Sequence, residues 1–394
     1  MHVKTGISAA ATAVLLLSST SAFAVDAQAF SERLKAVTAE QEIPLSFASA
    51  EAEGEDVILK DVSFGEYGDV GDLTFENVSG STPEGWTVER LALPEIDKTE
   101  DGNRAQVSGV SFEGIMLAGT DEANTPAAMK FSKLFFDKAT VASIDLGKDG
   151  TSVFTLTDAS MENEITDGGA FSTDFNVDGF TADLTAGDSP ETTQAIRDVG
   201  YDSISGSMTG SANWEPDSGL LELDPFEISV DDAGDLSFTY AISGYTPAFM
   251  ESLQQLQAQM ESNPDNQQAT GMAVMGLISQ LSLNSADITF TDDSLTGKLL
   301  DYYADKNGQS RAELVQNLTA MLPPVLGYLQ NPEFQQEVTD AVTAFLDDPQ
   351  ALSISIAPDN PVAATQIMGA AMGAPQTLPK VLSLSVGAND ANAE

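Results

Sequence analysis

The pattern that most limits how this chain can fold is a series of short stretches in which apolar and polar residues alternate. Between residues 43 and 245 they include Leu73-x-Phe75, Phe175-x-Val177 and Leu236-x-Phe238-x-Tyr240-x-Ile242. Successive side chains of a strand point to opposite sides of a sheet, so each stretch predicts a strand with one apolar face. Gly, Asp, Asn and Ser separate the stretches, as is typical of turns. We therefore expect a long, twisted, mostly antiparallel sheet.

A short phrase, an apolar residue followed by Ser or Asp and then Gly, recurs near the ends of these stretches. Examples are Val78-Ser79-Gly80 and Ile204-Ser205-Gly206, where the glycine permits a turn or a bulge. An alternative fold is a parallel β-helix, whose stacked rungs also favour Asn, Asp and Gly at turns. The irregular spacing of the phrase and the helices that begin at prolines argue against this alternative.

The second half of the chain carries helix signals. Thr246-Pro247 and Asn331-Pro332 each open an amphipathic stretch, Ser310 with Glu313 forms a capping-box pattern, and Pro323-Pro324 should split the helix that follows. Strands are expected at residues 352–356 and 381–386, with a helix begun by Asn360-Pro361 between them. The prediction is an α+β protein with a β-rich domain over 25–245, which begins with a short helix near 27–41, and a mainly helical region over 246–394 with two or three strands.

The first 24 residues are expected to be a signal peptide that is cleaved after Ala24. Lys4 precedes an uncharged stretch with Val14 to Leu17 at its centre, and Ala22-Phe23-Ala24 supplies small residues at the cleavage site. No cysteine follows for attachment of a lipid. Residues 269–283 form the most apolar later segment, which is too short to span a bilayer. We expect a periplasmic or secreted protein without stable membrane insertion.

The composition excludes several kinds of chemistry. His2 is the one histidine and the chain has no cysteine, so after cleavage no imidazole or thiol remains for Ser-His-Asp or Cys-His catalysis, for zinc sites or for disulfides. The leader holds one lysine and no acidic residue, which leaves 15 basic and 61 acidic side chains and a net charge of −46. That field repels nucleic acid and anionic lipid surfaces. No catalytic residue and no cofactor is predicted.

One stretch resembles the start of a calcium loop. Asp174, Asn176 and Asp178 precede a glycine in the D-x-[DN]-x-[DN]-G pattern, but Thr185 stands at the twelfth position, where a bidentate carboxylate is needed. The same residues alternate like a strand. These three residues are the weak candidates for a metal site, and no tight calcium site is expected.

The strand texture resembles that of AsmA-like and YdgA-like bacterial envelope proteins. The stretches that carry the resemblance are Leu73-x-Phe75-x-Asn77-Val78-Ser79-Gly80, Phe175-x-Val177-x-Gly179-Phe180 and Phe238-x-Tyr240-x-Ile242-x-Gly244. The resemblance implies a long curved antiparallel sheet in the periplasm and, for some members, a part in phospholipid handling. Those proteins usually keep an N-terminal membrane anchor, whereas Ala22-Phe23-Ala24 predicts release. No functional residue carries over.

These observations favour a non-enzymatic envelope protein that binds an apolar ligand, such as a lipid, or a partner protein. The alternatives are an acidic structural or adhesive exoprotein and, less favoured, a hydrolase that uses paired carboxylates. Methionines concentrate in the second half, where they either fill the core or line an apolar groove between sheet and helices. The residues predicted for that groove are Met250, Met260, Met272, Met275, Leu318 and Met321.

Overall fold

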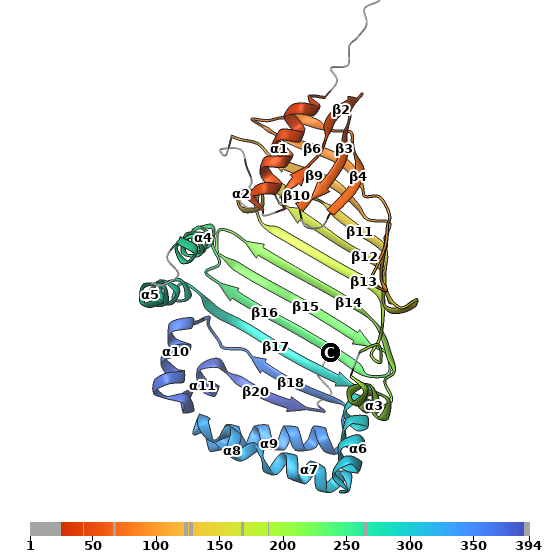
Figure 1. Cartoon of the computed structure of the whole chain (residues 1–394). Coiled ribbons are helices and arrows are strands. Elements are labelled where there is room, and N and C mark those ends of the chain that lie inside the picture. The colour runs from red at the N-terminus through yellow and green to blue at the C-terminus, as the bar shows by residue number, and fades with distance from the viewer. Residues whose placement is uncertain are drawn as a thin grey trace, which may run out of the picture.

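The computed structural model describes residues 25–41, 43–65, 68–121, 125, 129–166, 169–187, 189–262 and 267–389. The predicted signal peptide, residues 1–24, lies outside them. In the described residues, 20 strands form one unclosed sheet, with 33% helix and 45% strand (Figure 1). This confirms the α+β prediction of a long antiparallel sheet followed by a mainly helical region. Every strand pairing that the structure describes is antiparallel, which excludes the parallel β-helix.

The N-terminal part is a set of short strands covered by helix α1 (Ala27–Glu40). The Asp26 carboxylate accepts a hydrogen bond from the Ala29 amide at 3.0 Å and caps this helix. Phe30, in the middle of its buried face, meets two rings of the sheet edge-on, with centroids 5.2 Å from Phe75 and 5.7 Å from Trp86. These rings form the centre of the best-buried core of the protein. The strands of this part are β1 (Leu45–Ser46), β2 (Ser49–Glu53), β3 (Asp56–Phe64), β4 (Gly68–Glu76), β5 (Ser79–Ser81), β6 (Gly85–Ala92), β7 (Ile96–Glu100), β8 (Asn103–Ser108), β9 (Ser111–Ala118) and β10 (Leu134–Phe135).

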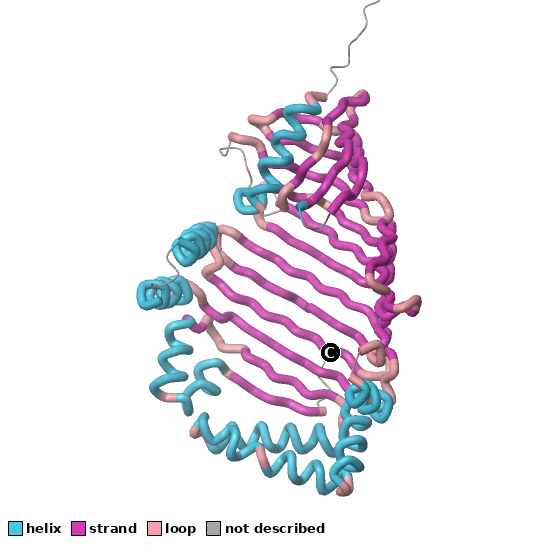
Figure 2. Tube along the Cα trace, viewed as in Figure 1, coloured by secondary structure: helices cyan, strands magenta, loops and turns pink. Residues whose placement is uncertain are grey.

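Longer strands continue the same sheet. Strand β11 pairs with both β8 and β9. From β11 onward each long strand pairs with the next one as far as β20, so the sheet continues beyond β16, which ends at Ser243 (Figure 1). Figure 2 shows these strands as one layer. They are β11 (Lys138–Lys148), β12 (Thr151–Ile165), β13 (Phe171–Asp183), β14 (Ser203–Glu215), β15 (Leu220–Val230), β16 (Gly234–Ser243), β17 (Ser282–Asp292), β18 (Ala351–Ile356) and β20 (Leu384–Ala388), and the short β19 (Val362–Ala363) pairs with β17.

The helices of the second half lie at the ends of the strands and beside the last strand (Figure 1). Ser310 and Glu313 form the predicted capping box, and the side chain of Asn331 caps the next long helix. Two prolines begin a short separate helix after Met321, as predicted. The helices after α1 are α2 (Met129–Ser132), α3 (Pro190–Val199), α4 (Pro247–Ser262), α5 (Gln267–Ile278), α6 (Leu295–Asn307), α7 (Arg311–Ala320), α8 (Leu322–Leu326), α9 (Pro332–Asp347), α10 (Ala364–Gly373) and α11 (Leu378–Leu382), with 3-10 turns η3 (Gly327–Leu329) and η4 (Pro375–Thr377).

Two local predictions in the second half were wrong. Residues 378–382 form helix α11, which has a proline in its first turn and ends at Ser383 with φ +46°, so the last strand begins only at Leu384. The helix expected from Asn360-Pro361 begins at Ala364, because Val362 and Ala363 first pair with β17. In the first case a helix with a proline in its first turn replaces the start of the predicted strand, and in the second case pairing with a distant strand overrides the local pattern. The second half also contributes four strands, not two or three.

Candidate functional site

One face of the long sheet is apolar from strand to strand. Residues directly opposite each other in paired strands share a face, so the registers define rows that run across the strands. A first row follows β12 to β20 through Met161, Phe175, Gly210, Phe226, Phe238, Ile288, Ile354 and Val386. A second row, two residues along each strand, consists of Ala159, Val177, Met208, Ile228, Leu236, Phe290, Leu352 and Ala388. We call the surface formed by these rows the apolar face.

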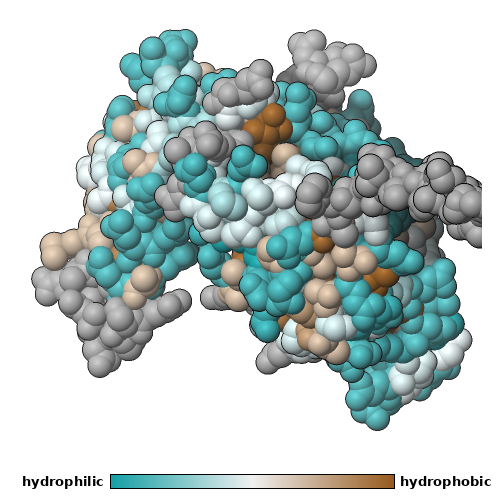
Figure 3. All heavy atoms as spheres, turned by 90° about the horizontal axis from the view of Figure 1, so that it is seen from above, coloured by the Kyte–Doolittle hydropathy of each residue, from teal (hydrophilic) through white to brown (hydrophobic). Residues whose placement is uncertain are grey.

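The residues between these two rows point to the opposite side of the sheet and are polar or small. They are Ser160, Asn176, Thr209, Glu227, Ser237, Thr289, Ser353 and Gly387. Each strand therefore separates apolar from polar side chains, as the alternation in the sequence predicts. Seen from above, the surface is mostly hydrophilic, and hydrophobic residues show as small patches (Figure 3).

The middle of the apolar face is open. Met161, Leu236, Ile288 and Ile354 keep 38%, 40%, 43% and 42% of their surface exposed, whereas Leu59 in the N-terminal core keeps 0%. In Figure 1, α1 lies in front of the N-terminal strands, and within the described residues no helix lies in front of β13 to β17. The helices of the second half do not cover the sheet as a core-forming layer would.

Packed elements bound the apolar face on two sides. Toward the N-terminal part, the ring of Phe135 meets Phe171 of β13 with centroids 6.1 Å apart. Toward the last strand, Phe345 of α9 meets Phe290 edge-on at 6.2 Å. The Glu337 carboxylate of the same helix accepts a hydrogen bond from the Val386 amide at 3.0 Å. Helix α9 thus protects the edge of β20, which would otherwise offer free amides to another strand.

Two glycines let aromatic rings lie flat on this face. A Cβ added at Gly210 would lie 2.2 Å from the ring of Phe175, and one added at Gly206 would lie 2.9 Å from the ring of Phe180. The ring of Phe175 also meets Phe226 of β15 at 5.7 Å across the intervening β14. The sequence phrase that includes Gly206 suggested a turn or a bulge. The structure places this glycine inside β14, where it makes room for a ring.

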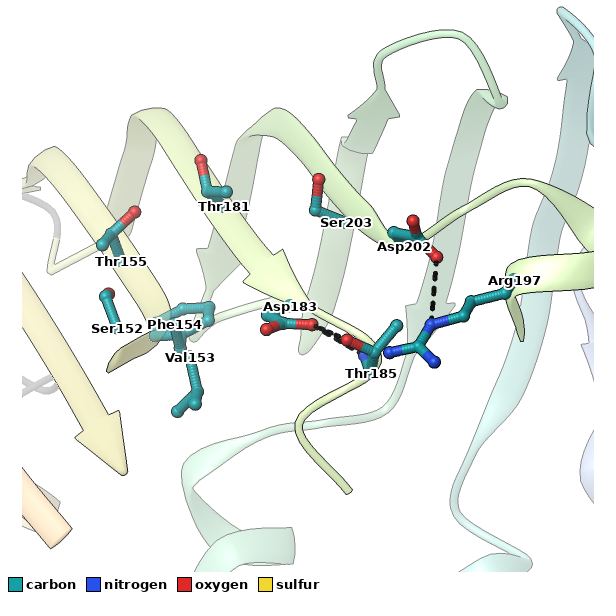
Figure 4. A pocket seen from close by; sticks show the side chains of 10 residues that line it. All are labelled: Ser152, Val153, Phe154, Thr155, Thr181, Asp183, Thr185, Arg197, Asp202 and Ser203. Carbon is teal, nitrogen blue, oxygen red and sulfur yellow. Dashed lines mark hydrogen bonds and ion pairs between the residues drawn. The ribbon is translucent and has the colours of Figure 1, made fainter. Parts of the chain in front are cut away.

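A polar hollow of about 480 Å³ lies where β12, β13 and β14 meet helix α3 (Figure 4). There the Asp183 carboxylate accepts hydrogen bonds from the hydroxyl of Thr185 at 2.7 Å and from its amide at 2.8 Å, which hold the pKa of Asp183 below its usual value. Arg197 lies 3.9 Å from Asp202, and both side chains are largely exposed. A carboxylate with a lowered pKa is a poor proton donor near neutral pH, so this hollow does not support acid catalysis.

The weak metal candidates lie within a strand. Asp174, Asn176 and Asp178 belong to β13, where the Asn176 amide donates a hydrogen bond to the Asp178 carboxylate. A strand spreads residues four apart over roughly 13 Å, whereas a calcium loop curls its ligands around one ion. No group of three or more His, Cys, Asp or Glu side chains able to hold a metal ion occurs among the described residues.

The six residues predicted to line a groove belong to two groups of helices. Met250 and Met260 lie on α4, and Met272 and Met275 lie on α5, which packs against α4 through Phe249, Leu256 and Leu277. Leu318 and Met321 lie on α7 and at its end, in the group of helices α6 to α9. The structure does not bring these two sets together over the sheet. Sequence reasoning predicted the apolar face of the strands from their alternation, but it placed the lining of the groove on helix residues that do not lie over that face.

A protein-family model described as "Uncharacterized protein" matches residues 227–389, from the middle of β15 to just beyond β20. The search of curated proteins found no match for this chain. Among the described residues, no helix is both long and apolar enough to cross a membrane.

Proposed function

We propose that this protein is a non-enzymatic, extracytoplasmic component of the bacterial envelope that binds lipid acyl chains on its apolar face. The observation that carries the proposal is the pair of apolar rows across eight strands, in which Met161, Leu236 and Ile288 keep about 40% of their surface exposed. A contiguous apolar surface exposed on a protein marks a site for an apolar partner. The periplasmic or secreted location rests on the predicted signal peptide.

The dimensions of the face favour acyl chains. Neighbouring strands lie about 4.8 Å apart, so a row from β12 to β20 spans roughly 34 Å, close to the thickness of a bilayer's hydrocarbon core. Each buried methylene contributes about 0.8 kcal/mol, so ten methylenes contribute about 8 kcal/mol before the cost of association. Burial along the rows therefore contributes a free energy of the same order as the cost of association.

The chemistry of the rows also favours hydrocarbon over a protein segment. The two rows contain no charged side chain, and the edge of β20 is occupied by Glu337, so a partner strand cannot extend the sheet there. A protein interface ordinarily adds a polar rim and about ten hydrogen bonds to its apolar centre. The resemblance of the strand texture to AsmA-like and YdgA-like proteins, some of which are implicated in phospholipid handling, supports the same choice.

Tryptophan fluorescence tests the proposal directly. Trp214 faces the same side as Phe171 and Leu221, its partners in β13 and β15, while Trp86 lies in the N-terminal core. In a Trp86→Phe background, Trp214 reports on the long sheet alone. A fatty acid with a brominated chain should quench this signal in a saturable way. Native mass spectrometry of the exported protein, purified without detergent, should show bound lipid.

Matched variants on one strand separate binding from general charge effects. Ile288→Asp places a carboxylate on the apolar face, whereas Thr289→Asp places the same charge on the opposite side of β17. We expect Ile288→Asp to weaken quenching about tenfold or more and Thr289→Asp to leave it unchanged, because a carboxylate against hydrocarbon is costly. Equal effects of both variants, or no quenching and no bound lipid in the wild type, would overturn the proposal. Recovery of a bound peptide in place of lipid would reassign the face to a protein partner.

A further inference from the structure

Three segments of this strongly acidic chain contain no charged residue. One residue in five of the chain is charged (20%), yet residues 267–286, 314–332 and 360–379 contain no Asp, Glu, Lys or Arg. They include helix α5, the end of α7 with α8 and η3, and helix α10. Such segments are ordinarily buried, because uncharged apolar helices gain little free energy from contact with water.

The structure brings these segments together at one end of the sheet. The Ala364 amide at the start of α10 donates a hydrogen bond to the Leu281 carbonyl, just after α5, at 3.0 Å. The Tyr328 hydroxyl of η3 donates to the Ala371 carbonyl of α10, also at 3.0 Å. Figure 1 shows α5, α10 and α8 along the left end of the strands.

Much of the apolar surface of these segments is exposed. On α5, Met272 and Met275 are 67% and 48% exposed and lie three residues apart on one side of the helix, while Leu277, on the other side, is buried. We call the exposed set the apolar rim. It consists of Met272 and Met275 with Met321 (63%), Val325 (71%), Tyr328 (66%) and Met372 (80%).

The apolar rim adjoins the apolar face. Helices α4 and α5 connect β16 to β17, where Ile242 and Leu283 are paired. Leu283 in turn pairs with Val362, two residues before α10. An acyl chain that lies on the apolar face at this end of the strands therefore ends beside the apolar rim.

We propose that the apolar rim docks the protein on the surface of a lipid bilayer, so that acyl chains pass between the bilayer and the apolar face. This inference rests on the proposed lipid-binding function. The rim side chains enter the boundary between head groups and acyl chains, and no helix in the described part of the chain is long and apolar enough to cross a bilayer. Exposed Tyr328 suits this boundary, because its ring is apolar and its hydroxyl is polar.

The net negative charge of the chain favours docking on zwitterionic over anionic bilayers. With 61 acidic against 16 basic residues in the sequence, the protein is repelled by anionic lipids, while the uncharged rim contributes hydrophobic insertion alone. Docking should therefore be strongest on zwitterionic vesicles. It should be weaker on anionic vesicles at low salt and should recover there as salt screens the repulsion.

Vesicle flotation tests the docking. The exported protein should float with phosphatidylcholine vesicles, and the double variant Met272→Glu, Met275→Glu should reduce the floated fraction about tenfold or more, since charged side chains do not enter hydrocarbon. The matched control is Ile43→Glu, Tyr303→Glu, which adds the same two charges at residues of 40% and 49% exposure outside the rim. This control should float like the wild type. No flotation of the wild type, or equal flotation of the rim variant, would overturn the proposal.

Two further measurements separate docking from acyl-chain binding. The rim variant should still show quenching of Trp214 by a brominated fatty acid delivered as monomer, while Ile288→Asp should lose that quenching and still float. If the brominated fatty acid does not quench Trp214 in the wild type, but the wild type floats with vesicles, the binding proposal fails and the docking proposal stands. Sedimentation without vesicles tests whether a second copy of the chain, and not a bilayer, covers the apolar rim. A dimer that the Met272→Glu, Met275→Glu variant dissociates would assign the rim to a second copy of the chain and overturn the docking.

Discussion

Truncating an apolar side chain should cost far less on the long sheet than in the N-terminal core. Full burial of an isoleucine side chain contributes about 1.5–3 kcal/mol. Ile288, at the centre of the apolar face, keeps 43% of its surface exposed, so Ile288→Ala should lower the free energy of unfolding by about 1–1.5 kcal/mol. Leu59 is 0% exposed, and Leu59→Ala should cost about 2–5 kcal/mol, because it also leaves a cavity.

Urea unfolding followed by circular dichroism and by tryptophan fluorescence measures both changes. Trp86 reports on the core that holds Leu59, and Trp214 reports on the long sheet, so each midpoint can be assigned even if the two parts unfold separately. The reasoning is refuted if Ile288→Ala costs as much as Leu59→Ala, since a loss of that size requires a covered face. In saturating fatty acid, the loss of unfolding free energy caused by Ile288→Ala should increase, while the loss caused by Leu59→Ala should stay the same.

Four further outcomes are predicted from local contacts. Ser310→Ala should cost about 1 kcal/mol of stability through loss of the N-cap of α7. The Ser310 amide and, to a smaller extent, the Ser310 hydroxyl donate hydrogen bonds to the Glu313 carboxylate and lower its pKa. The stability that these bonds contribute is therefore present above the ordinary Glu pKa near 4.3 and is lost as pH falls through the lower folded pKa. Thermal melts from pH 6 to pH 2.5 should show that loss in the wild type but not in Glu313→Gln. Gly210→Ala should cost roughly 1–3 kcal/mol in urea unfolding, because the added methyl group meets the ring of Phe175, and an unchanged midpoint would show that the ring is free to move. Tyr201→Phe should cost about 0.5–1.5 kcal/mol in the same assay by removing a hydroxyl that donates to a backbone carbonyl at 2.9 Å, and no loss would mean that the bond adds nothing to stability.

The candidate site was only partly visible in the sequence. The alternation in Leu236-x-Phe238-x-Tyr240 showed which side of its strand is apolar, but not whether another layer covers that side. The concentration of methionines suggested a groove between the sheet and the helices, yet Met272 and Leu318 lie on separate helices that do not cover the sheet. Local sequence records the character of each surface, while contact between surfaces depends on how distant elements pack.

The sequence by itself determined the local elements of this protein. Period-two alternation gave the strands, the Ser310 and Glu313 pair gave a helix start, and Asn331-Pro332 gave another, because these signals act over a few residues. Only the tertiary structure decided that Val362 joins β17 as a strand, that α9 covers the edge of β20, and that the centre of the apolar face stays open. Those outcomes depend on pairing and packing between segments far apart in the chain, where the competing arrangements share the same local pattern.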